Sequence, residues 1–273
     1  MTSSPAILYS MERYRNIDSP ANSRIKSLVQ LREGKGSGDI WLIEGLNIVK
    51  TAVGSGVHVE EVLATESVRD KNRSMFNKEL SHDTQVSIIS DRIAKKLSDT
   101  VTPQGIFAVV RYNFGTLDSL QHKGIIPVTD RIQDPGNLGT IIRTADAFGI
   151  KSMVILNGSC DPSSPKVVRS SAGSIFHINL VRSSEGELID WAGKNKVKML
   201  VSDMSSDNQL KDVAPGKRSL VVLGNEPSGV SAHLRNSSER HFSIPIPGRA
   251  ESLNVAVASA IIFYELSKKI KNA

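Results

Sequence analysis

Cysteine and long apolar runs are nearly absent from this sequence, and each absence excludes a class of protein. The 273 residues include one cysteine, Cys160, which excludes an internal disulfide and a cysteine metal cluster. No apolar run approaches the roughly 20 residues that a membrane helix requires. The apolar patch at residues 6–8 is also too short for the core of a signal peptide. We therefore expect a cytoplasmic protein without a membrane partner.

The histidines lack the spacing that metal sites use. They are scattered along the chain and form no HExxH or paired Cys/His pattern. The sequence therefore predicts no metal site. The six histidines are His58, His82, His122, His177, His233 and His241.

The chain carries a mild excess of positive charge. The formal net charge is +6, from 34 basic and 28 acidic residues. Such an excess fits a polyanionic partner such as RNA, although many soluble proteins are slightly basic without one. Both halves of the chain share the excess, so the sequence has no basic tail.

Strand-like and helix-like apolar patterns alternate along the chain, which predicts an α/β fold. Residues 1–20 lack periodicity and contain two prolines, so we expect a flexible arm there. We predict one α/β domain at residues 21–112, a linker at 113–123 and a second α/β domain at 124–273. The second domain has short, mostly apolar strands, which indicate a mostly parallel sheet that is buried on both faces. These strands are predicted at residues 125–132, 152–157, 197–203, 219–224 and 241–246.

Polar loops follow three of these strands, and ligands of open parallel sheets bind beyond the carboxyl ends of strands. The first loop opens "DPGNLGTIIRTADAFG", residues 134–149. Asn137 is a candidate N-cap for a helix that Gly149 ends. Arg143 falls on the polar side of that helix. This helix alone favours a solvated arginine that pairs with Asp146, with ligand binding as the alternative.

The other two loops are "LGNEPSGVS", residues 223–231, and "IPIPGRAESLNVAVASA", residues 244–260. Gly224 allows a ligand to approach the backbone closely, and Glu226 lies at the mouth of the sheet, although a plain turn would look the same. Ser252 is a candidate N-cap. Asn254 stands in the first turn of the last helix, where it could bind a ligand or only a helix-start amide.

Taken together, these three segments resemble the three motifs of the SpoU (TrmH-type) RNA 2′-O-ribose methyltransferases, of the SPOUT superfamily. The likeness spans residues 125–270, and "RSSAGSIFHINL" at 169–180 also resembles the segment between the first two motifs. Residues 21–112 resemble the L30e-like substrate-binding domain of many members, with "LIEGLNIVKTAV" as the signature. A dinucleotide-dependent oxidoreductase is disfavoured, because GxGxxG is missing.

The resemblance implies a trefoil-knotted catalytic domain, a homodimer with the active site near the subunit interface, and S-adenosylmethionine as methyl donor. The implied substrate is RNA, most often 23S ribosomal RNA in members with this front domain. A tRNA substrate and a non-catalytic RNA-binding role are the alternatives. By position in the motifs, the implied cofactor-binding residues are Leu223, Gly224, Asn225, Ile244, Pro245, Ile246, Ser252 and Leu253.

Arg143 is the catalytic arginine of the family by position, and Asn137, Glu226 and Asn254 are its implied polar partners. The family role of this arginine is that of a general base. A guanidinium has a pKa above about 12 and rarely gives up its proton. We therefore favour a phosphate clamp that also stabilises the developing alkoxide. The predicted RNA-binding residues are Arg24, Lys26, Arg32 and Arg169, with Arg13, Arg15 and Lys35 as further backbone contacts.

Overall fold

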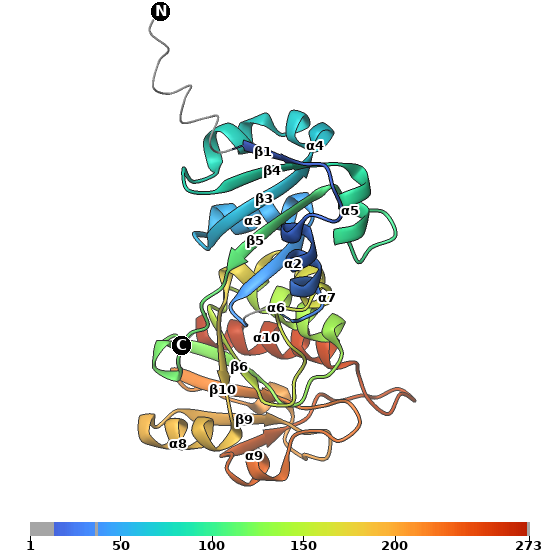
Figure 1. Cartoon of the computed structure of the whole chain (residues 1–273). Helices are drawn as coiled ribbons and strands as arrows, with labels where there is room; N and C mark the ends of the chain where they lie inside the picture. Colours follow the sequence, from blue (N-terminus) through green and yellow to red (C-terminus); the bar gives the residue numbers. More distant parts are fainter. Residues whose placement is uncertain (1–13, 36–37, 272–273) are drawn as a thin grey trace, which may run out of the picture. The chain divides into compact units, whose positions relative to one another are not determined.

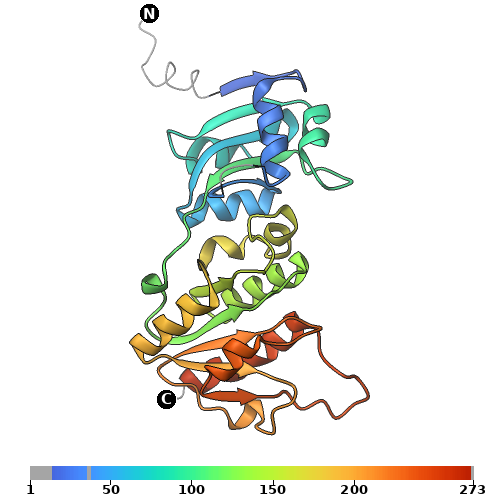
Figure 2. The same cartoon turned by 60° about the horizontal axis from the view of Figure 1, so that its bottom comes forward.

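The computed structural model describes residues 14–35 and 38–271, which form two compact units. The first unit contains the described residues up to Asn113 together with Ser163–Phe176. The second unit contains Phe114–Pro162 and the described residues from His177 onward. The chain therefore passes from one unit to the other three times. Figures 1 and 2 trace this path.

The first unit is built on a five-stranded mixed sheet with the order β1-β4-β3-β5-β2. Strands β1, β4 and β3 are parallel to one another, whereas β5 is antiparallel to both of its neighbours. The strands are β1 (Tyr14–Ile17), β2 (Ile40–Glu44), β3 (His58–Thr65), β4 (Gln85–Ile89) and β5 (Ile106–Arg111). The helices are α2 (Ser23–Arg32), α3 (Leu46–Ser55), α4 (Glu66–Lys71) and α5 (Asp91–Leu97), with a π-helical turn at Met75–Glu79.

The arm that we expected at residues 1–20 does not extend that far. Residues 14–17 form the edge strand β1, which pairs with β4. Only Ile17 of this strand is buried, so the sequence carries no alternating apolar signal that would reveal it. Residues 1–13, including Arg13, lie outside the described residues.

Residues 163–176 pack with the first unit, although the sequence suggested that they belong to the second domain. This segment contains α7 (Pro165–Ser170) and the start of a 3₁₀ turn at Ser174–His177. Val167 and Val168 of α7 are buried, and α7 contacts β2. Gly173, at φ +93°, approaches Thr51 so closely that a Cβ would lie 3.0 Å from the Thr51 Cβ. A sequence pattern cannot show this placement, because the partners lie about a hundred residues upstream.

The second unit is built on a six-stranded sheet with the order β11-β9-β10-β6-β7-β8. All five strand pairs are parallel, as the apolar strands predicted. Helices α6 and α10 cover one face, and α8 and α9 cover the other (Figure 1). The strands are β6 (Gly124–Thr129), β7 (Ser152–Leu156), β8 (Asn179–Ser183), β9 (Lys198–Ser202), β10 (Arg218–Leu223) and β11 (Arg240–Phe242). The helices are α6 (Pro135–Ala147), α8 (Glu185–Asn195), α9 (Ala232–Asn236) and α10 (Val255–Lys271), with 3₁₀ turns at Leu117–Ser119 and Leu210–Asp212.

Three boundaries in the second unit differ from the sequence expectation. The expected linker at 113–123 contributes to the core, because Leu120 is buried and Leu117 packs beside it. Strand β8 was not predicted; its polar ends at Asn179 and Ser183 leave too short an apolar pattern. Strand β11 ends at Phe242, earlier than expected, and the chain then projects as the loop before α10 (Figure 2).

Two negative findings apply to the described part of the chain. None of its helices is long and apolar enough to cross a membrane. Residues 14–35 and 38–271 also contain no group of three or more His, Cys, Asp or Glu side chains that could hold a metal ion.

Candidate functional site

The loops after β6 and β10 lie side by side, because these strands are neighbours in a parallel sheet. Helix α6 follows β6 and begins at Pro135, one turn earlier than predicted. Its N-cap is Asp134, whose side chain accepts a hydrogen bond from the Asn137 amide at 2.9 Å. Asn137 is therefore a first-turn residue and not the cap. Its side chain is left available for contacts outside the helix.

Glu226 joins the three predicted loops in one hydrogen-bond network. Its Oε1 accepts hydrogen bonds from the side-chain amides of Asn137, at 3.0 Å, and Asn254, at 2.8 Å. The backbone N–H of Val255 also donates to this oxygen, at 3.3 Å. Asn254 Nδ2 contacts Asn137 Oδ1 as well, at 3.0 Å. The structure thus brings together three of the four residues that the resemblance implied as catalytic.

Asn254 is the N-cap of α10, a position that we predicted for Ser252. Its Oδ1 accepts hydrogen bonds from the amides of Ala256, at 3.0 Å, and Val257, at 3.3 Å. Of the two interpretations that the sequence left open for Asn254, the structure shows the helix-start hydrogen bond. One end of its amide caps the helix, and the other end binds Glu226. The carboxylate of Glu226 is also favourably placed at a helix N-terminus.

Arg143 lies on the exposed side of α6. Within the described residues, its guanidinium forms no hydrogen bond or ion pair, and no hydrogen bond links it to Glu226. The ion pair with Asp146 that we considered does not form. Asp146 Oδ2 instead lies 2.8 Å from Nδ1 of His177. Arg143 therefore presents a charged group without a partner among the described residues.

A cavity of about 360 Å³ opens beside this network. Glu226 contributes to its wall, so the network and the cavity form one site. Seven of the eight residues that the resemblance implied for the cofactor line the cavity; Pro245 does not. The seven are Leu223, Gly224, Asn225, Ile244, Ile246, Ser252 and Leu253.

Sequence reasoning missed the part of the cavity wall that follows β9. Ser202, Asp203 and Ser205 line the cavity, together with Arg235 of α9. Burial of the Asp203 carboxyl raises its pKa. Hydrogen bonds from Ser205 and the charge of Arg235 outweigh burial, so the pKa lies below its usual value. The signal was present in the sequence, because "SDMSS" is a fourth polar loop after a predicted strand.

Gly224 is required by the fold of its own loop. A Cβ at this position would lie 2.3 Å from the Gly229 carbonyl carbon and the Val230 nitrogen. The loop turns back on itself there, and the Gly229 amide donates to the Asn225 carbonyl at 2.8 Å. We had attributed this glycine to the approach of a ligand. The structure supplies a further reason, which is the close approach of two stretches of backbone.

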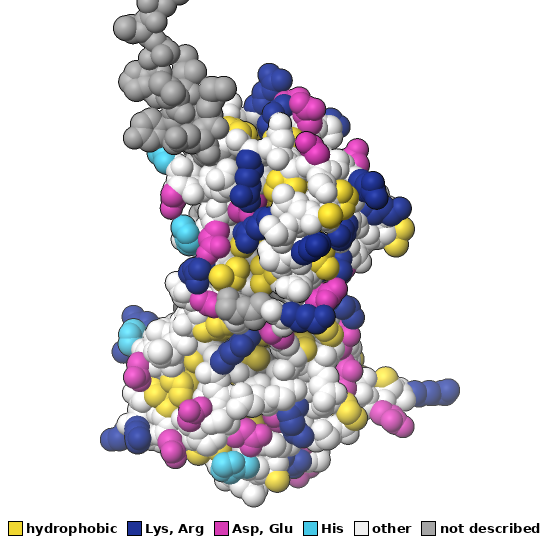
Figure 3. Space-filling view, in the orientation of Figure 1, with side chains coloured by type: hydrophobic (Ala, Val, Ile, Leu, Met, Phe, Trp, Pro, Cys, Tyr) yellow, Lys and Arg dark blue, Asp and Glu magenta, His cyan; other side chains and the backbone are white. Residues whose placement is uncertain are grey.

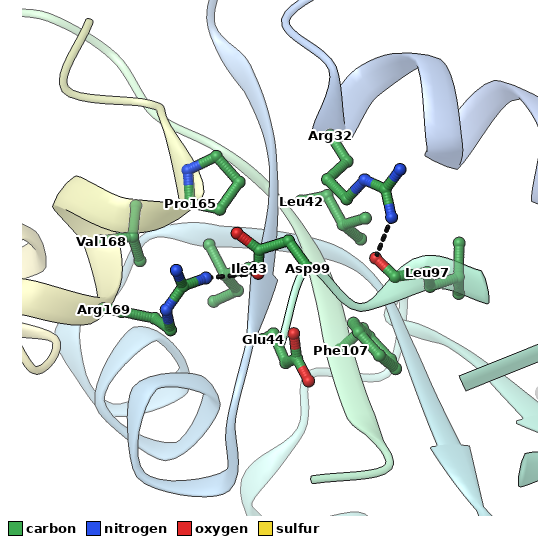
Figure 4. Close-up of a pocket in the computed structure, with 10 residues that line it drawn as sticks. All are labelled: Arg32, Leu42, Ile43, Glu44, Leu97, Asp99, Phe107, Pro165, Val168 and Arg169. Atoms are coloured by element: carbon green, nitrogen blue, oxygen red, sulfur yellow. Dashed lines mark hydrogen bonds and ion pairs between the residues drawn. The ribbon is translucent and has the colours of Figure 1, made fainter. Parts of the chain in front are cut away.

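Three of the four predicted RNA-binding residues form ion pairs or hydrogen bonds within the first unit. Arg24 binds Glu61 at 2.8 Å. Arg32 donates to the carbonyls at the end of α5, including that of Ser98 at 2.9 Å. Figure 4 shows Arg32 beside this helix end and Arg169 paired with Asp99. Arg15 and Lys35 also form ion pairs, with Glu61 and Glu33.

Lys26 differs from these arginines. Its side chain is exposed on α2, and it forms no hydrogen bond or ion pair with any described residue. It is therefore the one member of the predicted set of four whose charged group has no partner among the described residues. A basic residue type alone does not distinguish a structural ion pair from a phosphate contact.

Glu61 provides a test of these structural ion pairs. The side chain of Glu61 is 3% exposed. Burial raises its pKa, but hydrogen bonds from Ser87 and Arg15 and the charge of Arg24 outweigh burial and lower the pKa below 4.5. A lowered folded-state pKa stabilises the fold above the unfolded-state pKa, and this stabilisation is lost as pH falls through the folded-state value.

We expect Glu61→Gln to lower the free energy of unfolding by about 2 kcal/mol at pH 7. This is less than for a fully buried pair, because both arginines are partly exposed. Urea denaturation between pH 7 and pH 3 should show the difference from the wild type shrinking below pH 4.5. Glu66→Gln, at an exposed ion pair with Arg69, should change little. A deficit that is the same at every pH would contradict the assignment.

Comparisons with known proteins show which families this chain resembles in sequence. A model of the SpoU rRNA methylase family matches residues 124–264, and a model of the MRM3-like substrate binding domain matches residues 22–108. The 23S rRNA (guanosine(2553)-2′-O)-methyltransferase RlmP of Bacillus subtilis is 33% identical over 254 residues, covering 92% of this chain and 99% of the relative. The 23S rRNA (uridine(2479)-2′-O)-methyltransferase of Streptomyces viridochromogenes is 30% identical over 278 residues, covering 93% and 95%.

A solved structure of a methyltransferase is also similar to this chain. The SpoU methyltransferase AviRb from Streptomyces viridochromogenes, crystallised in complex with the cofactor AdoMet, has a TM-score of 0.83 to this chain. It is 27% identical, and the likeness covers 91% of this chain and 98% of that chain. The α/β fold and the family that the three motifs indicated are confirmed. The chain belongs to the SpoU rRNA methylase family.

Proposed function

We propose that this protein transfers the methyl group of S-adenosylmethionine to a ribose 2′-hydroxyl in large-subunit ribosomal RNA. The observation that carries the proposal is the cavity whose wall includes Glu226, held by Asn137 and Asn254. Two relatives named as 23S rRNA 2′-O-methyltransferases support the substrate. The proposal includes a cytoplasmic location, where ribosomal RNA and the methyl donor are both available.

The cavity suits S-adenosylmethionine. Such sites are mostly apolar, with a few polar groups that fix orientation. Leu223, Ile244 and Leu253 supply apolar surface, and the main chain around Gly224 supplies polar atoms. The bound donor would supply a methyl group already activated by a sulfonium. No metal is required for that chemistry.

The chain itself must make the ribose hydroxyl reactive, because that hydroxyl is barely ionised at neutral pH. Arg143 has an exposed guanidinium, which stays charged and can grip a phosphate in two places. In this proposal, the guanidinium binds the phosphate next to the target ribose and stabilises the oxygen anion that develops during transfer. Glu226, Asn137 and Asn254 orient the ribose, and the proton leaves to the phosphate or to water.

A second copy of the chain is part of this proposal. Helix α10 exposes Val257, Ile261 and Tyr264, at 51%, 39% and 57%. Their spacing places them on one side of the helix. The ring of Phe148, at the end of α6, packs against Tyr264 with centroids 6.1 Å apart. The apolar stripe therefore continues onto the helix that carries Arg143, where a partner subunit would place the active site near the interface.

We also propose that the C-terminal part of the second unit is threaded into the knot expected from the resemblance. The support is the path of the chain after β11. It leaves the edge of the sheet at β11 and returns as α10, which packs against α6 and against β6 in the middle of the sheet.

The dimer can be tested on the stripe of α10. We expect the wild type to sediment as a dimer, and Ile261→Glu to sediment as a monomer because a charge cannot be buried in an apolar interface. Val101→Glu is the control, since Val101 is 98% exposed in the first unit and should leave the dimer intact. A monomeric wild type would refute the dimer.

The first unit supplies a surface for the RNA backbone. Figure 3 shows Lys and Arg side chains over α2 and α5. Lys26 on α2 and Arg92 and Lys95 on α5 are exposed. Phosphate contacts of this kind position an RNA without reading its sequence. We propose that these residues replace the predicted arginines as the contacts of this unit.

The substrate is tested by mapping 2′-O-methylation across total RNA with and without the protein. We expect one new methylated position in large-subunit ribosomal RNA. A position in tRNA would support the alternative substrate. Absence of methylation, together with S-adenosylmethionine binding in calorimetry, would indicate an RNA-binding protein without activity.

A further inference from the structure

Asp130 and Arg131 contact the loop that carries Glu226. Neither residue belongs to the three motifs or takes part in the proposed chemistry. This loop, residues 224–231, is called the Glu226 loop here. Asp130, which follows β6, is fully buried. The next residue, Arg131, binds it in two places, with Nε 2.8 Å from Oδ1 and Nη2 2.9 Å from Oδ2. Charge-assisted pairs of this two-pronged kind are among the strong hydrogen bonds of proteins.

The pair forms four hydrogen bonds with the Glu226 loop, the longest of which runs from Arg131 Nη1 to Ser228 Oγ at 3.5 Å. Asp130 Oδ2 accepts a hydrogen bond from the Ser231 amide at 2.8 Å. Arg131 Nη2 donates to the Gly229 carbonyl at 3.1 Å. The Arg131 carbonyl accepts from the side-chain amide of Asn225 at 2.9 Å. These contacts lie on both sides of Glu226 in the sequence, so the pair holds both ends of the turn that carries it.

The backbone of Arg131 supports a specific role for this pair. Arg131 has φ +55°, in the left-handed region that residues other than glycine seldom adopt. Residues kept in this region cluster at functional sites, where the surrounding structure holds them. Gly158 makes room for the side chain, because a Cβ there would lie 3.0 Å from the Arg131 Cγ.

We infer that Asp130 and Arg131 are positioning residues for methyl transfer. They fix the Glu226 loop, and with it both the direction of the Glu226 carboxylate and the part of the cavity wall that residues 224–230 form. Neither residue lines the cavity, so they act through the loop. The inference rests on the proposed function, since it assumes that Glu226 and the cavity serve methyl transfer.

Hydrogen exchange on the protein alone tests whether the pair holds the loop. Arg131→Gly removes the guanidinium but permits the same positive φ, so the backbone path can persist. We expect exchange of amides in residues 224–231 to rise at least about tenfold in Arg131→Gly and in Asp130→Asn, with no change in β7. Arg182→Ala, which breaks an ion pair with Asp161 in the same unit, is the control. Unchanged exchange in the loop would overturn the inference.

A double-mutant cycle tests whether the pair acts through Glu226. In single-turnover methyl transfer, we expect Arg131→Gly to slow the wild type about tenfold and to slow Glu226→Gln less than about twofold. An equal slowing in both backgrounds would overturn the positioning role. If Glu226→Gln alone left the rate unchanged, the proposed role of Glu226 would fail instead. The exchange experiment separates the two failures, because it requires no activity.

Discussion

Arg143→Ala is expected to slow methyl transfer about a thousandfold while S-adenosylmethionine binding stays unchanged. The guanidinium is exposed on α6 and does not line the cavity, so its loss should not disturb the cofactor. Removing one preorganised group that stabilises developing negative charge commonly lowers the rate by about 10²–10³. Single-turnover transfer of labelled methyl to ribosomal RNA measures the rate, and calorimetry measures the dissociation constant of the cofactor.

Two further variants test the interpretation of this result. Arg143→Lys keeps the charge but loses the two-pronged geometry, so it should recover only part of the rate if the phosphate clamp is correct. Arg182→Ala removes a partly exposed arginine at strand β8 and should leave the rate unchanged. If Arg143→Ala stays within tenfold of the wild type, Arg143 is not the group that activates the ribose.

Gly224→Ala is expected to raise the dissociation constant of S-adenosylmethionine at least about a hundredfold. The added methyl would lie 2.3 Å from backbone atoms of Gly229 and Val230, which cannot move aside as a flexible side chain would. The loop must therefore shift, and it forms part of the cavity wall. Overpacking of this kind typically costs about 1–3 kcal/mol, so the fold should survive. Calorimetry and thermal unfolding measure the two effects.

The matched control is Gly193→Ala in helix α8, where a Cβ meets no atom within 4 Å. Alanine is the better helix former by about 1 kcal/mol, so this variant should bind the cofactor normally and unfold at a slightly higher temperature. Cofactor binding that is retained in Gly224→Ala would place the donor site elsewhere.

The loops that form the candidate site could be predicted, because local patterns of residue type mark them. Apolar strands followed by polar loops indicate where the carboxyl edge of a parallel sheet lies. Glu226 and Asn254 were identified from such loops, and the structure joins them at 2.8 Å. Their hydrogen bond could not be predicted in detail, since it depends on which strands are neighbours.

The partners of the basic residues could not be predicted, because a charged side chain has no sequence pattern that reveals its partner. Arg24 binds a carboxylate 37 residues away, and Arg32 binds carbonyls up to 66 residues away. Both were predicted to contact RNA. The same reason explains residues 163–176, whose partners in the first unit lie far upstream in the chain.

Sequence alone determined the alternation of strands and helices, the parallel sheet of the second unit, the family and the loops that carry the polar residues. These features depend on residue type and on contacts a few positions apart. Only the tertiary structure showed which charged side chains are paired, why position 224 requires glycine, and how Asp130 and Arg131 hold the Glu226 loop. The charge pairs and the hold on the Glu226 loop depend mostly on atoms that are close in space but distant along the chain, and the Gly224 contact depends on the exact turn of its loop. Local patterns of residue type do not reveal either.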